Sequence, residues 1–334
     1  MTGRTTGRTQ FFARPFTSLT LSQPAPPKAN SARTRFVAST SSSSSSGLPN
    51  TLALNLSRLI LAVCSAAKGG KVAAEPRAAY PGAVVEVWEL EMGDYDSILT
   101  FMRRVEGLDI VILNAGMATT EFALNKKTGH CQVVQVNYLS TFLLAILLLP
   151  VLRDREGKAP GRLTIVGSGA VFAAGLPNRG KRPFLKSFDD LAVQGWDASE
   201  RYFSSKVLGM LFFVRLFEHL PPAEEVVVNI VDPGFCKGTQ LHREARGLMS
   251  AVMSTAKALT GRSLEDGAWT YIDAAVVQGK ESHGCFVMDW GISGFYYAVY
   301  EPQGPELMDA LFEETMAELE FAGVREILGG LRKQ

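Results

Sequence analysis

The stretch Leu108-Asp109-Ile110-Val111-Ile112-Leu113, followed at once by Asn114-Ala115-Gly116, decides the fold of this chain. Its residues are mostly Val, Ile and Leu, and a small, tight turn ends it. An apolar run of this length, with no polar face, is typical of a strand buried on both sides in a parallel sheet. Four further runs of the same kind are predicted as strands: Ser57 to Val63, Ala83 to Leu90, Arg162 to Val166 and Val226 to Val231.

Helical stretches alternate with these runs. They are Asp96 to Arg104, His130 to Leu152, Ser199 to Leu220 and Glu265 to Val277. Alternating strands and helices imply right-handed crossovers and a parallel sheet that helices cover on both sides. We therefore expect an α/β, doubly wound, Rossmann-like sheet.

The most apolar helical stretch, Thr141 to Leu152, could suggest a membrane span. Gln135 and Asn137 interrupt it before it reaches the roughly 20 residues that a span needs. We expect a buried core or dimer-interface helix and no integral membrane segment.

Composition excludes several function classes. The chain has 334 residues and a net charge of +1, and residues 1–74 hold nine Lys or Arg and no acid, which leaves the remainder acidic. Nucleic-acid binding needs a basic face, so we expect none. The four cysteines are scattered and the four histidines do not cluster beside them, so we expect no metal.

Residues 1–50 differ from the rest. They are rich in Ser, Thr, Arg and Pro, contain the run Ser41 to Ser46, and lack apolar periodicity. We expect this stretch to be a disordered tail and residues 51–334 to be a single domain. An organellar transit peptide has the same composition, but we favour a tail or a mistaken gene start, and a cytoplasmic protein.

The residues just after each strand matter most, because ligands of open parallel sheets lie at the carboxyl ends of the strands. Asn114-Ala115-Gly116 follows the strand that ends at Leu113, Ser168 follows Val166, and Asp232-Pro233-Gly234 follows Val231. These turns are candidate ligand contacts, although each could also be an ordinary strand-ending turn.

Tyr202 and Lys206 lie four residues apart near the start of a helix and therefore on one face of it. A tyrosine has a pKa near 10, and an ammonium one turn away favours the phenolate. The phenol can then exchange a proton with a substrate while the Ser168 hydroxyl binds the substrate oxygen.

In their order along the chain these residues resemble the short-chain dehydrogenase/reductase family. The matching positions are Leu113-Asn114-Ala115-Gly116 for its Asn-Asn-Ala-Gly turn, Asn137 for its helix asparagine, Ser168 for its serine, Tyr202 with Lys206 for its signature, and Pro233-Gly234 for its Pro-Gly turn. The similarity runs from about Leu56 to about Leu319. Ser282-His283-Gly284 is similar to the retinol-dehydrogenase-like and fungal tailoring branches.

The resemblance implies roles for these residues. Tyr202 would be the proton donor or acceptor, Lys206 would hold the nicotinamide ribose and lower the tyrosine pKa, Ser168 would bind the substrate oxygen, and Asn137 would support a proton relay. Positions that would contact the cofactor are Ser65, Lys68, Glu91, Asn114, Ala115, Gly116, Tyr202, Lys206, Pro233, Gly234 and Thr239. Family likeness also implies a homo-oligomer formed through the His130 to Leu152 and Ser199 to Leu220 helices.

One family feature is missing. Members open with a strand, then Thr-Gly-x-x-x-Gly-x-Gly, then a helix, because glycines let the backbone approach the pyrophosphate. Thr2 to Thr9 has a superficial likeness, but no strand precedes it and Thr9 stands where the third glycine should be. We therefore expect the first strand, the glycine loop and most of the first helix to be absent. Either the gene model skips an exon or the chain is a degenerate relative.

The second strand indicates which nucleotide would bind. Cys64, Ser65 and Lys68 follow it, with no acid to accept the hydroxyls of the adenosine ribose, so a 2′-phosphate is accommodated better and NADP is favoured over NAD. Two positions depart from the family pattern. Cys64 stands where relatives often have arginine, and Glu91 where they have an adenine-contacting aspartate.

Two functions stay open. The first is an NADP-dependent oxidoreductase that interconverts carbonyl and alcohol on a small hydrophobic substrate, with a tailoring step of secondary-metabolite biosynthesis as a family-level expectation. The second is a silent binding or scaffold protein. An epimerase or dehydratase fits poorly, because only about a hundred residues follow Pro233.

The long interval from Ser168 to Tyr202, with the basic stretch Arg179 to Lys186 and Trp196, either shapes the substrate pocket or is a surface loop.

Overall fold

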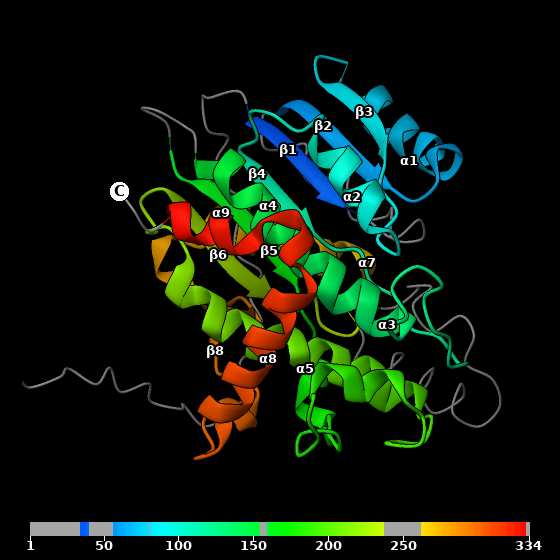
Figure 1. The fold of residues 1–334 in the computed structure, drawn as a ribbon. Helices are drawn as coiled ribbons and strands as arrows, with labels where there is room; N and C mark the ends of the chain where they lie inside the picture. Colours follow the sequence, from blue (N-terminus) through cyan, green and yellow to red (C-terminus); the bar gives the residue numbers. More distant parts are fainter. Residues whose placement is uncertain (1–33, 40–55, 80, 154–158, 237–261, 332–334) are drawn as a thin grey trace, which may run out of the picture.

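The computed structural model describes residues 34–39, 56–79, 81–153, 159–236 and 262–331. In this part of the chain one eight-stranded sheet runs through the molecule in the order β3-β2-β1-β4-β5-β6-β7-β8 (Figure 1). The strands are β1 Thr34–Ser39, β2 Leu56–Val63, β3 Val84–Glu89, β4 Ile110–Leu113, β5 Gly161–Val166, β6 Val226–Val231, β7 Phe286–Met288 and β8 Gly291–Ser293. Every neighbouring pair is parallel except β7 and β8. The doubly wound α/β class is thereby confirmed.

The expectation that the first strand is absent was wrong. Thr34–Ser39 forms β1 in the middle of the sheet, where Val37 pairs with Ile60 of β2 on one side and with Val111 of β4 on the other. Its sequence, TRFVAS, has only two large apolar residues and stands beside a Ser-rich run, so it carries little pattern of its own. Its place is fixed by β2 and β4, whose inner edges each need a partner for their backbone hydrogen bonds.

The prediction that the glycine loop is missing concerns the residues that follow β1. Residues 40–55 connect β1 to β2 and lie outside the described residues, as does the Thr2 to Thr9 likeness. Residues 40–55 contain one glycine, Gly47, so the glycine-rich sequence remains absent from the position where the family has it.

Helices cover both faces of the sheet (Figure 1). Their bounds are α1 Ala66–Ala79, α2 Tyr95–Met102, α3 Gln132–Val134, α4 Thr141–Arg153, α5 Ala198–Leu216, α7 Leu264–Ile272, α8 Gly304–Glu318 and α9 Val324–Leu331. The larger core lies under α2, α4 and α5, and a smaller one lies under α1 and α7. Both sides of the sheet are therefore buried, as continuous apolar strands require.

Helices α3 and α4 are joined by a π-helical turn, Gln135–Ser140, so that Gln132–Arg153 is helical throughout. In the described part of the chain this is the one helix long and apolar enough to cross a membrane, at 22 residues, but 83% of its apolar window is buried in the protein. Gln135 and Asn137, which interrupt the apolar run, lie in the π-helical turn, and both are buried. The interpretation as a core helix stands.

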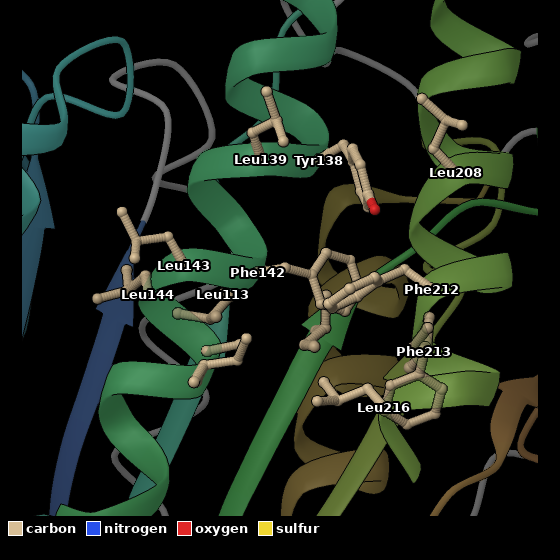
Figure 2. Close-up of a cluster of buried hydrophobic side chains, with 14 of the residues drawn as sticks. Leu113, Tyr138, Leu139, Phe142, Leu143, Leu144, Leu208, Phe212, Phe213 and Leu216 are labelled. Carbon is tan, nitrogen blue, oxygen red and sulfur yellow. The ribbon is translucent and has the colours of Figure 1, made fainter. Parts of the chain in front are cut away.

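The carboxyl-terminal helices cover the faces of α4 and α5 that point away from the sheet. Helix α8 packs on α5 and α9 packs on α4. Figure 2 shows the cluster between α4 and α5, in which the rings of Phe142 and Phe212 lie 5.0 Å apart. Phe312 of α8 stacks on Phe212 from the other side at 5.3 Å. These faces are thus buried within one chain, while the predicted homo-oligomer through the two helices stays a prediction.

A buried ionic cluster ties four segments of the chain together. His130 precedes α3, and its Nδ1 lies 2.8 Å from Oδ2 of Asp189 while its Nε2 lies 3.2 Å from Oε1 of Glu318 in α8. Tyr95 of α2 donates to the same Glu318 oxygen at 3.4 Å. Burial alone lowers the pKa of His130, but the hydrogen bonds and charges of Asp189 and Glu318 raise it to about 9.

The His130 cluster predicts a pH dependence of stability. Because the folded pKa of about 9 lies above the ordinary value of 6.5, the stabilisation is complete below pH 6.5 and is lost as pH rises through 9. The free energy of unfolding should fall by up to about 3 kcal/mol across that interval. Urea unfolding of the wild type and of His130→Gln, compared from pH 6 to pH 9.5, measures it. Equal pH profiles for the two proteins would contradict this assignment.

Candidate active site

The candidate site lies at the carboxyl ends of β4, β5 and β6, where the first turns of α5 approach the sheet. Helix α5 begins after Asp197, whose carboxylate accepts from the backbone N–H groups of Ser199 and Glu200. This cap fixes the start of the helix, and the four-residue spacing then places Tyr202 and Lys206 on one face.

Ser168 and Tyr202 are hydrogen-bonded through their hydroxyls. Ser168 has extended backbone after β5 and caps the 3-10 turn Gly169–Ala173, with its Oγ accepting from Ala170 N at 3.1 Å. Burial raises the pKa of the Tyr202 phenol to about 12, and the Ser168 hydrogen bond acts in the opposite direction. Tyr202 is therefore protonated at neutral pH and is placed to give that proton to an atom bound beside Ser168.

Lys206 lies one turn further along α5. Its Nζ donates to the carbonyl oxygen of Val166, at the end of β5, at 2.9 Å. Burial lowers the pKa of Lys206 to about 8, and the charge of Asp232 acts against that fall. The ammonium form thus predominates at neutral pH, at the point where β5 ends.

Asn137 occupies the π-helical turn and binds the loop after β4. Its side-chain oxygen accepts from Met117 N at 2.7 Å, and its Nδ2 donates to Met117 O at 2.9 Å and to Ser205 Oγ at 3.0 Å. A Cβ added at Gly116 would lie 3.3 Å from Asn137 Oδ1 and 3.7 Å from Lys206 Nζ. The sequence-predicted residues Gly116, Asn137 and Lys206 are thus brought together, and a side chain at position 116 would crowd the Asn137 amide.

The Pro-Gly turn after β6 needs its glycine. Gly234 has a φ of +73°, and a Cβ there would lie 2.9 Å from the Arg262 guanidinium. Pro233 and Gly234 therefore border the same end of the sheet as Ser168, whereas Thr239 lies outside the described residues. Asn114 and Ala115 lie on the neighbouring turn, partly buried.

The predicted nucleotide end of the site lies at the end of β2, beside the first turn of α1. Cys64 and Lys68 are exposed there, and Ser65 Oγ accepts from Lys68 N at 3.5 Å. Glu91 is exposed after β3, and its Oε1 accepts from Gly93 N at 2.9 Å. The Glu91 carboxylate therefore stabilises its own turn.

The long interval between Ser168 and Tyr202 is anchored at two places. Trp196 Nε1 donates to Thr120 O at 2.7 Å, in the loop that follows β4. Phe184 N and Leu185 N donate to the carboxylate of Glu314 in α8 at 2.8 and 2.6 Å. One end of the interval thus borders the site and the other packs on the carboxyl-terminal helices.

One residue beside the site was not recognised from the sequence. Asp232 was considered only as part of a turn, yet its carboxylate accepts from Gly169 N at 2.8 Å, beside Ser168. A charged residue directly after a fully apolar strand was the available signal. In the residues that the structure describes, no three His, Cys, Asp or Glu side chains could hold a metal ion together.

Comparisons with known proteins identify the family to which the chain is similar. A family profile described as short chain dehydrogenase matches residues 45–177. The chain is 46% identical to the short chain dehydrogenase/reductase mfmJ of Annulohypoxylon moriforme, over 84% of this chain and 82% of that one. It is 38% identical to the short chain dehydrogenase virL of Hypocrea virens, over 84% and 83% of the two chains.

Solved structures show the same fold at low identity. A 3-oxoacyl (acyl-carrier-protein) reductase from Agrobacterium tumefaciens, with NADP bound, matches 77% of this chain and 93% of its own at 16% identity and a TM-score of 0.57. An uncharacterized protein from Mycobacterium paratuberculosis matches 86% and 94% at 20% identity and a TM-score of 0.60.

Proposed function

Because the chain belongs to the short-chain dehydrogenase/reductase family, we propose that it is an NADP-dependent oxidoreductase that interconverts a carbonyl and an alcohol on a small hydrophobic substrate. The observation that carries the proposal is the pairing of the Ser168 hydroxyl with the Tyr202 phenol, with the Lys206 ammonium one helical turn away. These are a hydrogen-bond donor, a proton donor and a fixed positive charge at one end of the sheet.

In the direction of reduction, Ser168 donates a hydrogen bond to the carbonyl oxygen of the substrate and so favours the negative charge that develops there. Tyr202 gives its proton to that oxygen. The Lys206 charge stabilises the phenolate that remains, and it lowers the cost of the transfer because the phenol is otherwise a weak acid. Asn137 donates hydrogen bonds to the loop after β4 and to the Ser205 hydroxyl, and so holds both beside this group.

The residues on the sheet edge fit a nicotinamide nucleotide. The space at Gly116, bordered by Asn137 and Lys206, and the left-handed turn at Gly234 both leave backbone accessible to a ligand. When bound, the nucleotide supplies or accepts the hydride. Asn114, Ala115, Pro233 and Gly234 would border its nicotinamide end, and Ser65 and Lys68 its adenosine end, with Glu91 beyond.

The function is tested with the purified full chain, NADPH, and a panel of lipophilic ketones, following nicotinamide absorbance. We expect turnover with at least one ketone and binding of NADPH by fluorescence. NADPH binding without turnover would favour a silent binding protein, and a folded chain that binds no nucleotide would defeat the oxidoreductase proposal.

We expect Lys68 to make the protein bind NADPH more tightly than NADH. It is exposed in the first turn of α1, and no acid stands at the end of β2 to repel a 2′-phosphate. Lys68→Gln should weaken NADPH binding about tenfold, because a hydrogen bond to a charged group is lost, and leave NADH binding unchanged. Lys280→Gln, which removes a lysine paired with Glu224 far from this edge, is the control. A Lys68→Gln chain with unchanged affinity for both nucleotides would contradict this role.

As part of the same proposal, we place the reaction among the tailoring steps of secondary-metabolite biosynthesis, on the resemblance to the fungal branch. A homo-oligomer stays a prediction. Its contacts would lie away from the faces of α4 and α5 that α8 and α9 cover.

A further inference from the structure

We propose that Asp232 is a positioning residue for the reaction. Its carboxylate holds the Ser168 turn in place, and its charge lies at the end of β6 beside the end of β5, where Val166 pairs with Val231 and Lys206 binds the Val166 carbonyl. The inference rests on the proposed function and adds to it a residue that acts through its neighbours.

The carboxylate of Asp232 joins two turns that come from different strands. Asp232 directly follows β6 and is 7% exposed. Its Oδ1 accepts from Gly169 N at 2.8 Å, in the turn that Ser168 caps, and the carboxylate also accepts from the backbone N–H of Gly234. One side chain therefore fixes both the turn that presents the Ser168 hydroxyl and the Pro-Gly turn.

Space at this contact is limited. A Cβ added at Gly169 would lie 3.0 Å from Asp232 Oδ2 and 3.6 Å from Met288 Sδ. The Gly169 N–H thus meets the carboxylate at close range because glycine stands there. A displacement of the carboxylate would change the backbone of Gly169, and with it the direction of the adjoining Ser168 hydroxyl.

The same carboxylate is the charge that acts on the two proton-carrying groups. Asp232 raises the pKa of Lys206 against the effect of burial, and it raises that of Tyr202 as well. The charge of Arg262 favours the ionised form of Asp232, and the charge of Asp289 opposes it. Tyr271 of α7 and Cys236 are further titratable groups at this end of the sheet, and the pKa of Tyr271 is raised by burial and by the charges of Cys236, Tyr202 and Asp232. Burial raises the pKa of Asp232, while its backbone hydrogen bonds lower it.

The charge and the hydrogen bond can be separated by mutation. Asp232→Asn keeps an oxygen acceptor for Gly169 N–H and removes the charge, whereas Asp232→Ala removes both. Reduction needs both Lys206 and Tyr202 in their protonated forms. The rate of reduction therefore falls at high pH with the pKa of the group that loses its proton first. Removing a nearby negative charge lowers both pKa values, and this fall should move to lower pH by about one pH unit in Asp232→Asn. Asp232→Ala should show the same move together with a fall in kcat of about tenfold or more, as the Ser168 turn loses its anchor.

Two readouts distinguish this inference from the proposed function. The first is the pH profile of ketone reduction for the wild type, Asp232→Asn and the control Asp309→Asn, which removes an exposed carboxylate of α8 paired with Arg215. The second is the NMR titration of Lys206 with carbon-13 at Cε, assigned with Lys206→Met, which needs no turnover. If the wild-type chain shows no turnover, only the proposed function is defeated. The Lys206 titration still measures the effect of the Asp232 charge on the Lys206 pKa, because it needs no turnover. An Asp232→Asn chain whose Lys206 titration and pH profile match the wild type overturns the inference.

Discussion

Replacement of Tyr202 by phenylalanine should lower kcat for ketone reduction about a thousandfold while leaving the fold intact. The phenol proton is the one that the carbonyl oxygen receives, and loss of a general acid typically costs two to four orders of magnitude. The ring itself stays, so packing against Phe203 at 6.1 Å between centroids is kept. Because Lys206 is retained, we expect NADPH affinity to change little. The measurement is steady-state kinetics with saturating NADPH, together with NADPH fluorescence.

Tyr300→Phe is the matched control, because it removes a phenol hydroxyl from an exposed side chain, where that hydroxyl accepts from Phe295 N at 2.9 Å. We expect its kinetics to match the wild type. A Tyr202→Phe chain that keeps more than about a tenth of wild-type kcat would remove Tyr202 from the proton-transfer role.

Truncation of Phe212 to alanine should lower the free energy of unfolding by about 3–5 kcal/mol. Phe212 is 0% exposed and its ring lies between Phe142 of α4 and Phe312 of α8. The substitution therefore opens a cavity in the cluster between α4 and α5 that Figure 2 shows. Urea unfolding at pH 7, followed by circular dichroism, measures the loss.

The comparison for this change is Phe321→Ala, in which the same atoms are removed from a side chain that is 53% exposed. Its cost should stay below about 1 kcal/mol, because most of that ring is already in water. If Phe212→Ala is no more destabilising than Phe321→Ala, the carboxyl-terminal helices do not share a core with α4 and α5.

Short-range patterns account for the parts of the fold that the sequence predicted. Five apolar runs matched β2 to β6 within a residue or two, because a strand buried on both faces must be apolar along its whole length. The four-residue spacing of Tyr202 and Lys206 placed them on one face of α5 by helix geometry alone. The residues that follow the strands met at one edge because the strands are parallel.

Contacts between distant residues account for what the sequence did not predict. Strand β1 carries little apolar pattern, and its place between β2 and β4 comes from their unpaired edges. The burial of α4 and α5 under α8 and α9 depends on pairs such as Phe212 with Phe312, which no local period reveals.

The sequence by itself therefore determined the class of sheet, five of its strands (β2 to β6) and the order of the site residues, since these follow from local periodicity and from the direction of the strands. Only the tertiary structure decided that β1 completes the sheet, that α8 and α9 close the helical face, and that Asp232 stands beside Ser168, Tyr202 and Lys206. Those outcomes depend on which buried edges and faces remain to be covered once the chain has folded, and that is a property of the whole molecule.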